Sequence, residues 1–120
     1  MQSETHFIAR YAETDQMGIV HHSNYPVWFE AGRTDFLKKA GIANSKIEAL
    51  GILLPLTYMD CSFKNPAKYE DEITVKTKIR KMTCVRLEFE YVITNKDEAV
   101  IAVGSTSHAW TDKLLKPLNI

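Results

Sequence analysis

The sequence lacks an excess of charge of either sign. Its 120 residues include 15 Lys and Arg and 15 Asp and Glu, so the formal net charge is zero. Proteins that bind nucleic acid through its phosphates normally present a basic field, and this chain has none as a whole. We therefore expect no nucleic-acid partner. Local groups of basic residues remain able to bind a small polyanion.

Long apolar segments are also missing. No run approaches the roughly 20 residues that a membrane-spanning helix requires. The first residues, MQSETHF, have neither the basic region nor the apolar stretch of a signal peptide. We expect a cytoplasmic protein with no membrane partner.

Cysteine is scarce. Cys61 and Cys84 are the only two, and their spacing does not resemble a metal-binding pattern. Both fall in strand-like apolar segments. We therefore expect two buried free thiols in a reducing compartment.

What the sequence does contain is typical of one globular domain covering residues 1–120, with 45% hydrophobic residues. After Ser23 and Asn24, both favourable N-cap residues, apolar side chains recur at helical spacing. Gly41 is a natural C-cap, so a helix of about 16 residues is predicted. The predicted buried face consists of Tyr25, Trp28, Phe29, Gly32, Phe36 and Ala40.

The remaining segments show strand patterns, apart from a short helix predicted at residues 45–50. Pro55 near the start of the second strand favours an edge position. One buried helix and an antiparallel meander indicate an α+β fold. The predicted strands are residues 5–11, 53–63, 73–80, 85–93 and 99–110.

Reactive side chains are densest between residues 10 and 37. Asp15 precedes a turn around Gly18, and a helix begins soon afterwards. A carboxylate beside a helix N-terminus suits acyl transfer, because the unpaired amides of the first turn stabilise a developing oxyanion. By position alone, Asp15 is better explained as a solvated or turn-forming loop residue. A metal site formed with His21 and His22 is weakly supported, because no third ligand follows at regular spacing.

Three motifs carry a resemblance to a known family. They are YxETDxxGIVxHxxY with a following ExxR, then FKNPAKYEDEITV at residues 63–75, and GSTSHA at residues 104–109. In this order they resemble the 4-hydroxybenzoyl-CoA thioesterase family of hotdog-fold acyl-CoA thioesterases. The resemblance covers nearly the whole chain. It implies a five-stranded antiparallel sheet wrapped around one long central helix.

The resemblance also implies an activity, the hydrolysis of an acyl-CoA to a free acid and CoA. Asp15 matches the family's catalytic carboxylate, either a nucleophile or a general base, and Glu13 is a flanking residue. The backbone amide of His22 matches the donor to the thioester carbonyl. Gly18 lets the loop turn, and Tyr25 is a candidate to line the acyl pocket. No metal or cofactor is needed for this hydrolysis.

Coenzyme A carries phosphates, which bind cations. The candidates are Lys64, Lys68 and Arg86, with Arg80 and Lys81 nearby in sequence. The family pattern further implies a homodimer, assembled into a homotetramer, with the site at a subunit interface. His108 is interpreted as a structural histidine.

Other classes remain open. A hotdog dehydratase pairs an Asp with a His five positions later, but Val20 occupies that position here. A non-catalytic acyl-CoA-binding protein is compatible with the same fold. A thioesterase acting on acyl carrier protein is also compatible, because an acidic carrier would dock on the same basic residues.

Overall fold

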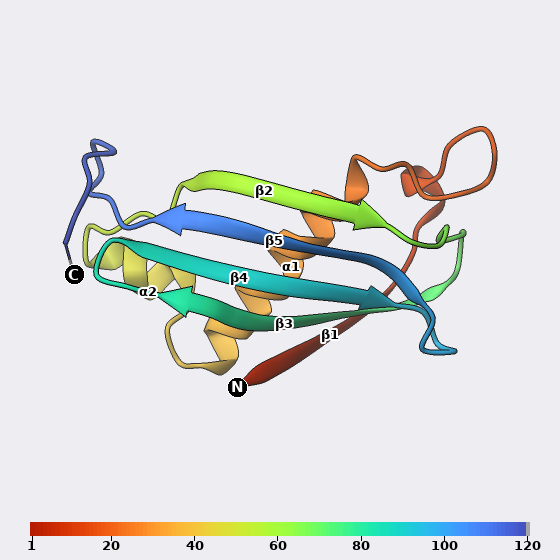
Figure 1. The fold of residues 1–120 in the computed structure, drawn as a ribbon, viewed down its shortest axis with the longest axis horizontal. Coiled ribbons are helices and arrows are strands. Elements are labelled where there is room, and N and C mark those ends of the chain that lie inside the picture. The colour runs from red at the N-terminus through yellow and green to blue at the C-terminus, as the bar shows by residue number, and fades with distance from the viewer. Residues whose placement is uncertain (120) are drawn as a thin grey trace.

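The computed structural model describes residues 1–119 of the chain; Ile120, the last residue of the predicted domain, lies outside them. The strands form one antiparallel sheet in the order β1-β3-β4-β5-β2. The long helix α1 lies against one face of this curled sheet (Figure 1). The elements are β1 (Gln2–Ile8), a 3-10 turn (Tyr11–Glu13), α1 (Asn24–Lys39), α2 (Asn44–Ala49), β2 (Leu56–Phe63), β3 (Glu72–Met82), β4 (Arg86–Thr94) and β5 (Val100–Ala109). The predicted α+β fold, with five strands around a long helix, is confirmed.

Helix α1 has the predicted length of 16 residues. Gly41 follows its end with a φ of +81°, which suits the predicted C-terminal glycine. Ser23 precedes the helix, but its side chain makes no capping bond. Its hydroxyl instead lies 2.8 Å from Nδ1 of His21.

The core lies between α1 and the sheet. Phe29 stacks on Tyr91 of β4, with ring centroids 4.4 Å apart, and Phe36 meets Phe89 edge-on. Gly32 faces Val75 and Thr77 of β3 so closely that an added Cβ would lie 2.5 Å from the Thr77 hydroxyl. The glycine therefore lets the helix approach the sheet. Within residues 1–119 no helix is long and apolar enough to span a bilayer.

Strand β1 begins and ends about three residues earlier than predicted. Its partner β3 sets the limits, because Gln2 pairs with Lys78 and Ile8 pairs with Glu72. Beyond Ile8 the chain turns away from β3 and enters the 3-10 turn at Tyr11. The short pattern alone could not show where the partner strand ends.

The prediction of two buried thiols is wrong. Cys84 is exposed, since it lies in the turn between β3 and β4, and Cys61 on β2 is only partly covered. Strand β2 is the edge strand that Pro55 predicted, with a register irregularity between Leu56 and Tyr58. An edge strand leaves one side of the chain without a neighbouring strand.

Candidate active site

Asp15 lies in a tight loop that its own carboxylate stabilises. One carboxylate oxygen, Oδ1, accepts hydrogen bonds from the amides of Met17 at 2.8 Å and Ile19 at 3.4 Å. The Asp15 amide donates to the Ile19 carbonyl at 2.8 Å, and Gly18 turns the chain with a φ of +78°. Gly18 therefore turns the loop, as the sequence predicts. The second oxygen, Oδ2, accepts no hydrogen bond from residues 1–119 and is available for a ligand.

The two ends of this loop are joined at its base. Thr14 and Val20 form an isolated antiparallel bridge, and the amide of His21 donates to the carbonyl of Glu13 at 2.8 Å. The Val20 amide donates to the Ala67 carbonyl at 2.7 Å, which ties the loop to the segment after β2. The loop is therefore held on both of its sides.

His22 follows this base and lies just before α1. The amides of His21, Asn24 and Tyr25 donate to protein carbonyls, whereas the His22 amide makes no hydrogen bond within the described residues. A free amide at a helix entrance is the arrangement that binds an oxyanion. The imidazole of His22 stacks at a tilt on that of His21, with ring centroids 4.1 Å apart.

A cavity of about 400 Å³ connects these groups. Tyr25 lines it from the first turn of α1, and Phe63 lines it from the end of β2, with ring centroids 5.3 Å apart. Burial raises the pKa of the Tyr25 hydroxyl, a hydrogen bond with the Ala67 backbone opposes this, and Cys61 adds to the rise. The tyrosine is therefore neutral at physiological pH. The lining residues are Asp15, Met17, Ile19, Val20, His21, His22, Tyr25, Phe63, Lys64, Asn65 and Pro66.

Two of the three predicted phosphate-binding cations lie beside the loop. Lys64 lines the cavity, and Lys68 pairs with Ile19 in an isolated bridge. Arg86 does not join them within one chain. Arg86 is the first residue of β4. Near the other end of that strand, Ile93 pairs with Ala102 of β5, which in turn pairs with Phe63 of β2, so Ile93 marks the level of the cavity on the sheet. Seven residue steps along β4 place Arg86 about 23 Å from that level, where its guanidinium lies 3.8 Å from Glu88.

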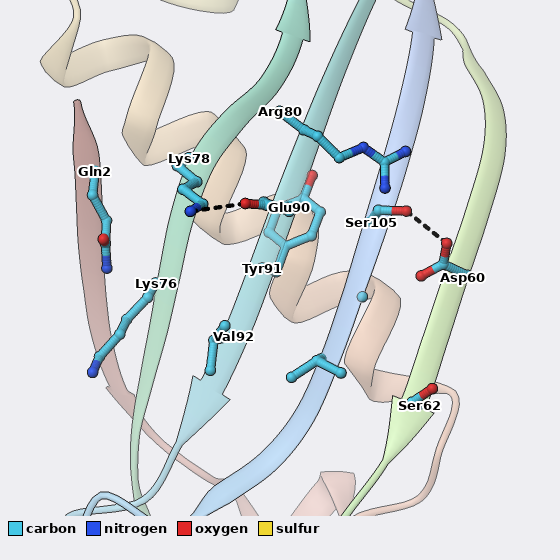
Figure 2. Close-up of a pocket in the computed structure, with 12 residues that line it drawn as sticks. Gln2, Asp60, Ser62, Lys76, Lys78, Arg80, Glu90, Tyr91, Val92 and Ser105 are labelled. Carbon is cyan, nitrogen blue, oxygen red and sulfur yellow. Dashed lines mark hydrogen bonds and ion pairs between the residues drawn. The ribbon is translucent and has the colours of Figure 1, made fainter.

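A second depression, of about 370 Å³, lies on the sheet, and Arg80 is the one residue among the sequence-predicted cations that lines it. Figure 2 shows Lys76 and Lys78 on β3, Arg80 reaching from β3 across β4, and Asp60 on β2 at the other side of this surface. Lys78 pairs with Glu90 at 2.9 Å, and the Ser105 hydroxyl donates to Asp60 at 2.6 Å. Its charges are therefore already largely matched within the chain.

The sequence prediction missed two residues that shape the site. The carboxylate of Glu13 is 5% exposed and accepts from the Trp28 indole, and the amide side chain of Asn24 donates to the Glu13 carbonyl. Glu13 was expected only to flank Asp15. The sequence does show a carboxylate, Glu13, shortly before a helix that carries the indole donor of Trp28. Their contact, however, depends on how the loop between them folds.

Comparison with known proteins places this geometry in context. The pattern of the thioesterase-like superfamily matches residues 9–117. The Bacillus subtilis protein YneP, whose name assigns it provisionally to the acyl-CoA thioesterases, is 39% identical over 104 residues. That match covers 87% of this chain and 75% of YneP.

Two further relatives differ in their named substrates. The solved structure of a DHNA-CoA thioesterase from Staphylococcus aureus is 34% identical and superposes with a TM-score of 0.94, covering 98% of this chain and 80% of that chain. The Arabidopsis thaliana chloroplastic acyl-acyl carrier protein thioesterase ATL3 is 27% identical. Its match covers 90% of this chain and 57% of ATL3.

Proposed function

The chain belongs to the thioesterase-like superfamily, and from this premise we propose that it hydrolyses the thioester of an acyl-CoA to a carboxylic acid and CoA. The observation that carries the proposal is the meeting of an available Asp15 oxygen and an unpaired His22 amide at one cavity. Thioester hydrolysis requires a nucleophile or general base near the carbonyl carbon and a donor to the carbonyl oxygen, and these two groups can supply them.

The reaction can be written with the chain's own groups. As general base, Asp15 takes a proton from water through Oδ2 while the water oxygen bonds to the thioester carbon. The carbonyl oxygen becomes an anion and accepts a hydrogen bond from the His22 amide. The carbon–sulfur bond then breaks, the acid leaves, and the CoA thiolate takes up a proton.

As nucleophile, Asp15 would instead bond to the carbonyl carbon and release the thiolate. The resulting anhydride is then cleaved by water. Both routes need the same feature, a carboxylate fixed through one oxygen and free at the other. The bonds to Met17 and Ile19 provide it, because they hold Oδ1 and leave Oδ2 toward the ligand.

The cavity suggests how the substrate is held. Lys64 and Lys68 are exposed cations beside it and suit the phosphates of CoA. Phe63 lines the cavity from β2, an edge strand whose apolar side chains Leu56, Tyr58 and Phe63 are half exposed. We propose that a second copy pairs along β2 and completes the site, in a homodimer or homotetramer.

The first test is release of free thiol from short, medium, long and aromatic acyl-CoAs by the wild-type protein and Asp15→Asn. The asparagine keeps the shape of the side chain but cannot act as a base. We expect turnover on at least one class and a loss of about 100-fold or more in the variant. Equal turnover by both proteins would exclude Asp15 from the chemistry.

A second candidate function is hydrolysis of acyl groups on acyl carrier protein. The relationship to ATL3 supports it, as do the exposed lysines beside the cavity, which suit an acidic carrier. The same assay with matched acyl-CoA and acyl-carrier substrates separates the two by their kcat/KM. Binding of acyl-CoA with no turnover of either substrate would favour a non-catalytic binding protein.

A further inference from the structure

We infer that Glu13 is a positioning residue that sets the separation between the Asp15 carboxylate and the His22 amide, with Asn24 as its partner. The inference rests on the proposed function, since it assigns these two groups to one reaction. Neither Glu13 nor Asn24 lines the cavity, so each would act only through the residues it holds.

The side chain of Glu13 joins the loop to α1. Its Oε2 accepts a hydrogen bond of 2.8 Å from the indole of Trp28, and this contact is buried. Its Oε1 accepts one of 2.8 Å from the Arg10 amide, with the Arg10 Nε at 3.5 Å. An ionised carboxylate can accept on both oxygens, whereas an amide can accept on only one.

The backbone of Glu13 joins the two ends of the loop. Its carbonyl accepts from the His21 amide at 2.8 Å and from Nδ2 of Asn24 at 2.9 Å. The same Nδ2 lies 3.2 Å from the His21 carbonyl. One asparagine on the first turn of α1 therefore holds both strands of the loop base.

The consequence lies in the positions that follow. Asp15 comes two residues after Glu13, and His22 comes directly after His21, so the two proposed reacting groups extend from opposite sides of the Glu13–His21 hydrogen bond. A shift of Glu13 therefore changes the distance between the Asp15 carboxylate and the His22 amide. Displacements of about 1 Å in an active site can reduce turnover about 100-fold.

The central experiment compares Glu13→Gln and Asn24→Ala with the wild type in the thiol-release assay. Glutamine leaves either the indole or the Arg10 amide without an acceptor, and alanine removes the link between the loop ends. We expect kcat to fall about tenfold or more in each variant while KM changes less than about twofold. The Trp28→Phe variant removes the indole donor and should also lower kcat, and combining it with Glu13→Gln should give less than the product of the two losses because both act on the bonds of one carboxylate.

A control separates positioning from general destabilisation. Leu87 is a buried residue near the start of β4, at the end of that strand away from Phe63, and Leu87→Ala truncates the core there. We expect this variant to lower the melting temperature at least as much as Glu13→Gln and to keep kcat within about twofold. The inference is overturned if the loss of kcat follows the loss of melting temperature in the same proportion in Leu87→Ala and in Glu13→Gln. The role of Glu13 would then be merely structural.

A second readout does not depend on any substrate. Amide hydrogen exchange should speed up about tenfold or more at His21 in Glu13→Gln and in Asn24→Ala, while the amides of β4 keep their protection. Unchanged exchange at His21 in both variants would overturn the inference. If the wild type hydrolyses no thioester, the proposed function fails, and exchange at His21 still decides whether Glu13 holds the loop.

Discussion

At the residue scale, His108 shows how the core holds a titratable group in one state. Its Nδ1 lies 3.1 Å from the Leu54 carbonyl and therefore donates, which leaves Nε2 to accept from the Thr106 hydroxyl at 3.0 Å. The Tyr91 hydroxyl then donates to Thr106 at 2.6 Å. A neutral imidazole satisfies this chain of bonds, and its burial favours that form. The bonds agree with the structural role that the sequence predicts for His108.

Because His108 is neutral when folded, acid should destabilise the protein. Burial lowers the pKa of His108, the bond to Leu54 opposes this, and the charge of Arg33 lowers it further. The unfolded chain therefore binds more protons below about pH 6.5, and the free energy of unfolding falls as the pH drops through that value. Between pH 7.5 and 5.5 we expect this group to contribute a loss of up to about 1.4 kcal/mol in urea unfolding.

The matched variant for this prediction is His108→Gln, which has no titration in that range. Its unfolding free energy should depend less on pH than that of the wild type. Identical pH slopes in the two proteins would show that His108 is not responsible.

Residue-scale prediction could group residues that are local in the sequence. Asp15, Gly18 and His22 lie in one loop, so their order along the chain already indicates their proximity. The roles of Glu13 and Asn24 could not be predicted from the sequence, because their hydrogen bonds form only when the folded loop contacts α1. Arg86 is a prediction that the structure does not support within one chain. It was grouped with Lys64 as a basic residue near a loop, but the length of β4 separates it from the cavity that Lys64 lines.

At the scale of elements, α1 was the most predictable part of the chain. Its aromatic stripe and closing glycine fixed both its existence and its length. The strands were located with less certain ends, because the limits of β1 are set by its pairing with β3 rather than by its own residues. The partial exposure of Cys61 depends on strand order, which the pattern of one strand does not contain, and the exposure of Cys84 depends on where β3 and β4 end.

The contact of α1 with β3 leads to a prediction for Gly32. Helix propensity alone would make Gly32→Ala stabilising by about 1 kcal/mol. An added Cβ would, however, lie 2.5 Å from the Thr77 hydroxyl and 2.8 Å from Cγ1 of Val75. We expect a net loss of about 1–3 kcal/mol in thermal or urea unfolding.

The neighbouring Ala31 provides the control, since it is exposed on the same helix. Ala31→Gly should cost only about 1 kcal/mol through propensity. A rise in melting temperature for Gly32→Ala would contradict the close packing of α1 on β3.

At the scale of the whole molecule, the two edges of the sheet differ. Strand β2 presents Leu56, Tyr58 and Phe63, which are 49%, 57% and 57% exposed. We predict that these side chains are covered in the oligomer. Tyr58→Lys and Phe63→Lys should therefore shift the assembly toward a single chain of 13.7 kDa, measured by sedimentation or light scattering.

The other edge offers a comparison. His6→Lys alters an exposed position on β1 and should leave the assembly unchanged. Loss of assembly in this variant, with none in the β2 variants, would move the interface to the β1 edge. Thiol release by Tyr58→Lys reports whether association is needed for turnover, whereas Phe63 also lines the cavity, so Phe63→Lys changes the site directly.

The strand order also determines when the parts of the protein can assemble during synthesis. The meander β3-β4-β5 pairs neighbours in the chain and can form as soon as it is made. Strand β1 must wait for β3, whose Lys78 pairs with Gln2, and β2 must wait for β5, the last strand to leave the ribosome. Since the Asp15 loop lies between β1 and α1, and Phe63 of β2 lines the same cavity, this cavity should be among the last features to form on a nascent chain. Until then the apolar β2 segment stays open to chaperones and to premature contact with other chains.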